Sequence, residues 1–94
     1  MAELPLPRAE IKLAGRTISR TNIANDYGNR VHWKILRDGA EVATPEARSA
    51  DSFTHTDATP GMYEVVLETW KHEGYQSKAL GKYIEISNKV SFRV

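Results

Sequence analysis

Residues 59–69 read Thr-Pro-Gly-Met-Tyr-Glu-Val-Val-Leu-Glu-Thr, a turn followed by a strand pattern. The Pro-Gly pair fits the two central places of a type II turn, because proline presets φ at the first place and glycine accepts positive φ at the second. In a strand, alternate side chains point to opposite faces. Tyr63, Val65 and Leu67 therefore share one face, and the two glutamates lie on the other. This stretch predicts a β-strand with one face in a core and one face toward solvent.

The last segment of the chain, residues 84–94, has the same alternation. Apolar side chains share one parity, polar and charged ones share the other, and only Asn88 interrupts the apolar face. An antiparallel register that sets Leu67 against Val90 also places glutamates opposite basic residues on the outer face. We therefore expect the last two strands to pair in that register, unless a bulge near Asn88 shifts it.

Shorter β-prone segments precede these two strands. Turn-forming residues separate the segments, which lie at residues 4–14, 17–23, 31–36, 41–43 and 52–56. No stretch of eleven or more residues has the apolar spacing of a helix. About seven short strands without a helix are typical of an all-β, two-sheet antiparallel sandwich, and a single closed barrel is the alternative. The predicted structural core is centred on Trp33, Phe53, Tyr63, Val65 and Phe92.

Length and composition restrict the possible functions. The 94 residues fit a single domain, expected to span 1–94. Thirteen Lys and Arg against twelve Asp and Glu leave a net charge of +1, too small a surplus to make nucleic acid the expected ligand. The chain has no cysteine, which excludes disulfides and cysteine-ligated zinc. No apolar run is long enough to cross a bilayer and no signal-peptide pattern opens the chain, so membrane insertion is not expected and the compartment stays open.

Residues 55–65, His-Thr-Asp-Ala-Thr-Pro-Gly-Met-Tyr-Glu-Val, together with Trp33 and the Asp-Gly turn at 38–39, resemble PKD and bacterial immunoglobulin-like domains. The resemblance is good over residues 31–69, and its motifs are structural ones. It implies an immunoglobulin-like sandwich of about seven strands. In such a sandwich, Tyr63 would form a tyrosine corner, with its ring buried and its hydroxyl bonded to the backbone upstream.

The residue types that carry catalysis or bind metal do not cluster along the chain. The three histidines, His32, His55 and His72, are not at the spacings of zinc ligands. We expect His55 to hydrogen-bond near the Pro-Gly turn and the other two to lie in solvent. The acidic residues are too scattered for a calcium loop, and there is no Gly-x-Ser-x-Gly motif or glycine-rich phosphate loop. We therefore expect no catalytic residues, no metal site and no cofactor.

The connection between the last two strands is unusually long. It runs over residues 70–83, whereas hairpin connections usually have about two to five residues, and long ordered loops are often functional. Its aromatic and basic side chains suit contact with a protein or with a sugar ring. The candidate binding residues are Trp70, Tyr75, Lys78 and Tyr83. Alternatively, Trp70 only folds over the end of the sandwich and is covered by Leu80.

These observations predict a non-catalytic immunoglobulin-like module for adhesion, protein interaction, or structural spacing and decoration, in a bacterial surface protein or a phage structural protein. Its partner would be a protein or glycan surface. If the module is part of a larger chain, it would itself be secreted, lie at the cell surface or belong to a virion. The alternative is a carbohydrate-binding module that uses the aromatic residues of the 70–83 connection. A small hydrolase would instead need a cleft that holds a nucleophile and a base in contact. The sequence leaves the identity of the partner and the oligomeric state open.

Overall fold

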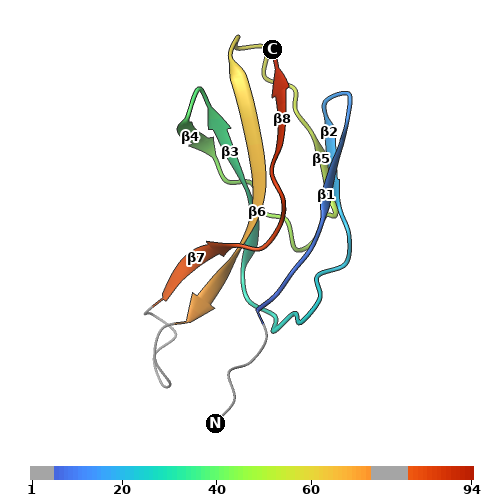
Figure 1. Ribbon diagram of the computed structural model, residues 1–94, viewed down its shortest axis with the longest axis vertical. Coiled ribbons are helices and arrows are strands. Elements are labelled where there is room, and N and C mark those ends of the chain that lie inside the picture. The colour runs from blue at the N-terminus through green and yellow to red at the C-terminus, as the bar shows by residue number, and fades with distance from the viewer. Residues whose placement is uncertain (1–5, 73–80) are drawn as a thin grey trace.

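The chain folds into two antiparallel β-sheets (Figure 1). The computed structural model describes residues 6–72 and 81–94. The small sheet has the order β1-β2-β5, and its strands are β1 (Ile11–Ala14), β2 (Thr17–Arg20) and β5 (Ser52–Thr54). The large sheet has the order β4-β3-β6-β7, with β8 also paired to β6, and its strands are β3 (Val31–Arg37), β4 (Ala40–Ala43), β6 (Met62–His72), β7 (Gly81–Glu85) and β8 (Val90–Arg93). The described residues contain no helix, and hence none that could cross a membrane.

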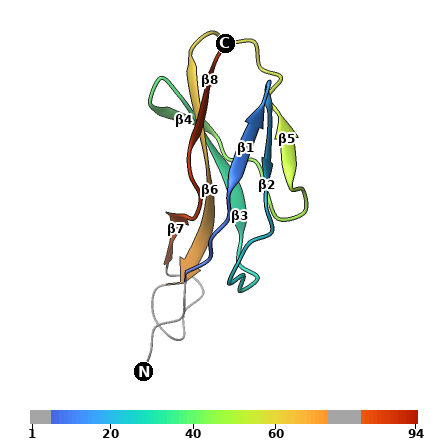
Figure 2. The same ribbon diagram turned by 45° about the vertical axis from the view of Figure 1, so that its right-hand side comes forward.

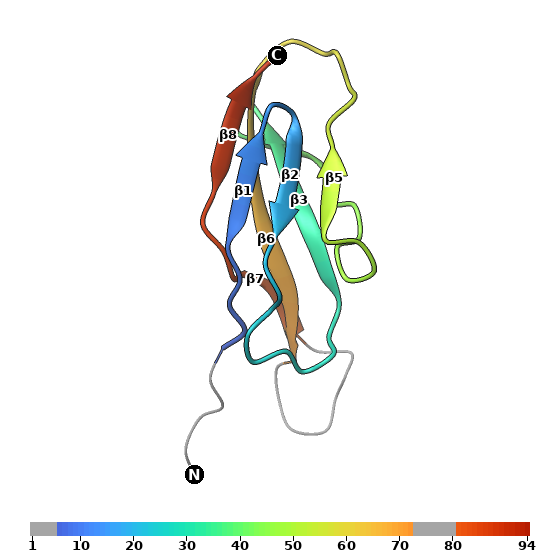
Figure 3. The ribbon, with the colours of Figure 1, turned by 90° about the vertical axis from the view of Figure 1, so that its right-hand side faces the viewer.

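The two sheets are the two layers of a sandwich. Figures 2 and 3 show β1, β2 and β5 facing one side of the large sheet. β7 and β8 pair with opposite ends of β6, so they serve as two halves of one edge strand. The all-β sandwich predicted from the alternation is confirmed, with eight strands in the described residues. β1 begins only at Ile11, later than predicted, because the N–H groups of Arg8 and Ala9 donate to the carbonyl oxygens of Ala24 and Ile86 and not to β2.

The core lies between the sheets and consists of side chains from their inner faces. Trp33, Tyr63 and Val65 have no exposed surface. The ring of Trp33 in β3 packs against Phe53 of β5, with ring centroids 5.4 Å apart, and so joins the two layers. Phe53 and Phe92 are only partly buried and pack at the margin of the core. Burying a large apolar side chain contributes roughly 1.5–3 kcal/mol, so these contacts fix which face of each strand turns inward.

An aromatic cluster lies at the end of the sandwich where β6 begins. The Tyr63 hydroxyl donates a hydrogen bond to the carbonyl oxygen of Thr59 at 2.8 Å, which is the upstream backbone contact predicted for this residue. The Tyr63 ring lies parallel to that of Phe92, with centroids 5.3 Å apart, and 4.4 Å from that of His55. The hydrogen bond predicted for the His55 ring is not formed at Nε2, which is buried without a partner among the described residues. His55 therefore contributes by ring packing.

The turn before β6 differs from the type II turn predicted for the Pro-Gly pair. Gly61 has a φ of +155°, whereas the second central place of a type II turn requires about +80°. The glycine instead extends the ladder with β8: its N–H donates to the Val94 carbonyl at 3.1 Å, and its own carbonyl accepts from the Val94 N–H at 3.0 Å. A Cβ atom at Gly61 would lie 2.8 Å from Cγ of Arg37 in β3. Close packing against β3 therefore favours glycine here.

The register of the last strand also differs from the prediction. β8 pairs with the start of β6 so that Val65, and not Leu67, faces Val90. β7 pairs with the end of β6, and residues 86–89 interrupt the strand between β7 and β8. The N–H of Leu67 there donates to the Ser87 hydroxyl oxygen at 2.9 Å. The partners move by an even number of residues, which changes the cross-strand pairs and keeps each side chain on its predicted face.

Asn88 lies within this interruption and joins the two sheets. Its Oδ1 accepts from the Ile11 N–H at 2.9 Å, and its Nδ2 donates to the Ile11 carbonyl oxygen at 3.0 Å. Nearby, the Ala9 N–H donates to the Ile86 carbonyl oxygen at 2.9 Å. Figure 3 shows β8 and β1 side by side along this side of the sandwich. Asn88, the one polar residue in the apolar pattern of the last strand, thus provides hydrogen-bond partners for the backbone of Ile11 at the edge of β1.

We expect Asn88→Ala to lower the free energy of unfolding by about 1–3 kcal/mol, because it leaves the buried Ile11 N–H without its hydrogen-bond acceptor. Urea denaturation followed by circular dichroism measures the loss. Asn22→Ala, at an exposed position, is the matched control and should change stability by less than about 0.5 kcal/mol. Equal stability of the two variants, with the Ile11 amide still protected from hydrogen exchange, would contradict this role for Asn88.

Trp33→Ala should cost roughly 3–5 kcal/mol of stability, because a large side chain is removed from a fully buried position. Phe92→Ala should cost less, since its ring is only partly buried and water can enter the space it leaves. Urea unfolding of both variants tests this order. A loss at Trp33 below that at Phe92 would be incompatible with the position of the indole between the sheets.

Candidate functional site

The candidate binding site is a groove on the outer face of the large sheet, the face turned away from the small sheet. Its volume is about 360 Å³, and it is lined by residues 28–32, by Thr44, Glu46 and Arg48, and by Tyr83. We refer to it below as the groove. Its floor is the start of β3, one wall is the connection that follows β4, and the other wall is the Tyr83 side chain of β7.

The floor of the groove is held by a polar cluster around His32. Nε2 of His32 lies 2.8 Å from Oε1 of Glu68 on β6, and Nζ of Lys34 lies 3.7 Å from the other carboxylate oxygen. Glu68 is only 7% exposed although it lies on the outer face. The Tyr83 ring lies over His32, with centroids 4.0 Å apart and planes at 33°. Because both His32 and Tyr83 are held by neighbours, the floor and one wall have fixed positions.

The opposite wall is held by Arg48. Its guanidinium group binds both carboxylate oxygens of Asp26, at 2.9 and 2.8 Å, and its Nε donates to the Asn29 carbonyl oxygen at 2.8 Å. Such a bidentate pair fixes geometry as well as contributing energy. The hydrogen bonds from Arg48, and next from the Gly28 N–H, lower the pKa of Asp26 to about 2. Arg48 thus joins the loop before β3 to the connection after β4, the two segments that border the groove.

Backbone pairing extends this wall along the edge of β3. The Trp33 N–H donates to the Pro45 carbonyl oxygen and the Ala47 N–H donates to the Val31 carbonyl oxygen, both at 2.9 Å. Ala47 is fully buried in the core, which anchors the connection from below. The edge of β3 at the groove is therefore already occupied by this chain.

The structure brings two of the four predicted binding residues together. Trp70 and Tyr83 face each other across β6 and β7, with ring centroids 5.2 Å apart and one edge toward the other ring. Both are partly buried. A Cβ atom at Gly81 would clash with the backbone carbonyl oxygen of Lys71 and lie 2.8 Å from the indole of Trp70, so only glycine fits there. Tyr83 lines the groove and Trp70 lies beside it; Tyr75 and Lys78 fall outside the described residues.

The sequence prediction missed the other residues of the groove. His32 was expected in solvent, but its side chain is 12% exposed because Glu68 and Tyr83 enclose it. Glu46 and Arg48 lie in a segment without a strand pattern, and they reach the groove only because this segment pairs with β3. The alternation of His32 with its neighbours predicts that its side chain points to the outer face. No local pattern predicts that Glu68 and Tyr83 enclose that side chain there.

Comparison of the chain with protein-family models, with curated proteins and with solved structures finds no significant match. The fold and the groove are therefore the evidence for function. Within the described ranges, no group of three or more His, Asp or Glu side chains is arranged to hold a metal ion.

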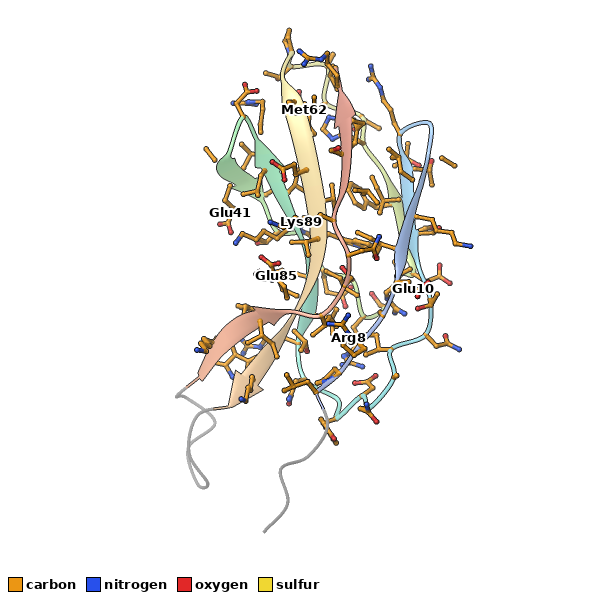
Figure 4. The ribbon with its side chains drawn as sticks, in the orientation of Figure 1. Arg8, Glu10, Glu41, Met62, Glu85 and Lys89 are labelled. Carbon is orange, nitrogen blue, oxygen red and sulfur yellow. The ribbon has the colours of Figure 1, made fainter. Side chains whose placement is uncertain are left out.

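The Arg48–Asp26 pair should make the stability of the groove wall depend on pH. The pKa of Asp26 is lowered in the folded protein from 3.8 to about 2, so its stabilising contribution is complete well above pH 3.8 and is lost as the pH falls through about 2. The melting temperature of the protein should therefore exceed that of Asp26→Asn near neutral pH, and the difference should disappear in strong acid. Glu41→Gln, at an exposed acid on β4 (Figure 4), is the control. A difference that persists unchanged to pH 2 would contradict the pairing.

Proposed function

We propose that this chain is a non-catalytic, immunoglobulin-like module that attaches to a bacterial envelope or a phage particle through the groove. The observation that carries this proposal is the fixed geometry of the groove walls, given by the Arg48–Asp26 pair on one side and by the His32–Tyr83 stack on the other. A binding site that is ordered before its ligand arrives loses less conformational entropy on binding.

The arrangement of strands supports the immunoglobulin-like part of the proposal. A three-stranded sheet of β1, β2 and β5 packs against a sheet in which β3 and β6 are central. A tryptophan is buried on β3, and a tyrosine on β6 bonds back to the backbone four residues upstream. Both features are typical of immunoglobulin-like sandwiches.

The shape of the domain supports a role in adhesion or spacing. The molecule measures 47 × 23 × 20 Å. Figure 1 shows Val94 at one end of the long axis and the first described residues at the other. The start of β3 and the strand β7, which border the groove, lie toward the latter end (Figure 1). Such a module can hold a following segment away from the surface that the groove contacts.

The chemistry of the groove supports binding rather than catalysis. A hydroxyl nucleophile needs a base within hydrogen-bond reach. In the described part of the groove, the hydroxyls of Thr44 and Tyr83 make no hydrogen bond to a histidine or carboxylate, and Nε2 of His32 is engaged by Glu68. These contacts hold the side chains of the groove in position, but none of them would activate a hydroxyl group as a nucleophile.

The proposal is tested by binding of the fluorescently labelled protein to purified bacterial envelopes and phage particles. We expect saturable binding that Arg30→Glu weakens about tenfold or more, the effect of losing a contact worth about 1.4 kcal/mol. Arg30 is exposed and lines the groove, so the change should leave the fold intact. Arg16→Glu, a matched charge reversal in the exposed turn between β1 and β2, should have no effect. Absence of saturable binding, or equal effects of the two variants, would refute the proposal.

A further inference from the structure

We infer that the ligand of the groove is an uncharged sugar ring of a surface glycan. This inference rests on the proposed function and specifies the chemistry of its ligand. It follows from the charges that remain unpaired in the groove, from the aromatic wall, and from the edge of β3 that is already occupied.

The charges around the groove are largely neutralised by one another. Arg48 is paired with Asp26, and Glu68 is ion-paired with Lys34 and hydrogen-bonded to His32. The guanidinium group of Arg30 has no hydrogen-bond or ion-pair partner among the residues that the structure describes. A polyanion needs several cations at once, so a single free arginine is poor support for a phosphate polymer or nucleic acid.

The polar groups left for a ligand include both a donor and an acceptor. Arg30 offers only N–H donors. The Glu46 carboxylate already accepts hydrogen bonds from the Arg48 N–H and from the N–H and hydroxyl of Ser49, so it offers a ligand only the lone pairs that these bonds leave free. An anionic ligand would be repelled by Glu46 and a cationic ligand by Arg30. A hydroxyl group both donates and accepts, so a ring that carries several hydroxyls can satisfy the two side chains together. The hydroxyl of Thr44 and the amide of Asn29 add further groups of the same kind.

The aromatic wall suits the apolar C–H surface of a sugar ring. Tyr83 is partly buried and lines the groove, and contacts with the rings of His32 and Trp70 hold its ring in place. An aromatic side chain whose position is already fixed gives contact area at small entropic cost. The groove volume of about 360 Å³ lies near the lower limit of small-molecule sites, which is roughly 300 Å³. This space matches a small ring better than a folded protein surface.

A peptide is disfavoured by the backbone around the groove. Extended peptides commonly bind by adding a strand to a free sheet edge. The edge of β3 beside the groove already pairs with the connection after β4, through Pro45 and Ala47. An extended peptide would therefore find no unpaired backbone along β3 at the groove.

The test is a titration of the ¹⁵N-labelled full chain with neutral monosaccharides, followed by amide NMR spectra. We expect at least one neutral sugar to cause saturable shifts confined to residues 28–32, 44–48 and the surroundings of Tyr83. Arg30→Ala and Tyr83→Leu should each raise the dissociation constant several-fold, whereas Arg16→Ala should leave it unchanged. Tyr83→Leu removes the ring that the sugar would contact, and the amide spectrum of the free variant shows that the fold is kept. Tyr83→Phe retains the ring and should bind nearly as well as the unchanged protein.

Glucuronic acid, glucosamine, inorganic phosphate and a short unstructured peptide are titrated in parallel. Tighter binding of any of these than of every neutral sugar would overturn the inference, as would neutral-sugar shifts that ignore both groove variants. If envelope binding depends on Arg30 while no neutral sugar binds, the proposed function stands and the ligand class is wrong. If a neutral sugar binds in the groove while envelopes and phage particles do not bind, the ligand class stands and the proposed function fails.

Discussion

The pairing of β3 with β6 is the interaction on which the rest of the structure depends. The two strands form an antiparallel ladder along the whole of β3. Because successive side chains alternate between faces, the inner side of this ladder supplies Trp33 to the core, and the outer side supplies His32 and Glu68 to the floor of the groove. One register therefore sets both the packing that stabilises the domain and the geometry of the candidate site. A slip of a single residue would exchange the two faces and remove both.

Polar side chains complete the sandwich where the backbone ladders end. Asn88 satisfies the edge of β1, Ser87 accepts a hydrogen bond from β6, and Arg48 connects two loops that share no strand pairing. A single hydrogen bond contributes only about 1 kcal/mol to the stability of the folded protein. A buried backbone N–H or C=O group without a partner lowers that stability by more than this amount. In a chain without disulfides, such contacts hold the edges together, and the same kind of contact holds the groove walls in place before a ligand binds.

The fold was more predictable from the sequence than the site. Alternation predicted the inward face of β6, and the resemblance to immunoglobulin-like domains implied the backbone contact of Tyr63. Both features depend on residues close together in the chain. The predicted register of the last strand was wrong, since a shift by an even number of residues leaves the face pattern intact, and the pattern does not show contacts such as that of Asn88 with β1. Tyr83 was identified by its residue type and its unusual connection. His32 was missed because the side chains that enclose it come from β6 and β7.

The sequence by itself determined the all-β architecture and the face on which each side chain lies, because the period of a strand is a local property of the chain. Only the tertiary structure decided which strands meet in which register and that the connection after β4 runs along β3. That path places Glu46 and Arg48 opposite Tyr83, although some 35 residues separate them along the chain. Contacts between distant segments depend on how the whole chain closes around its core, which no local pattern of residues specifies.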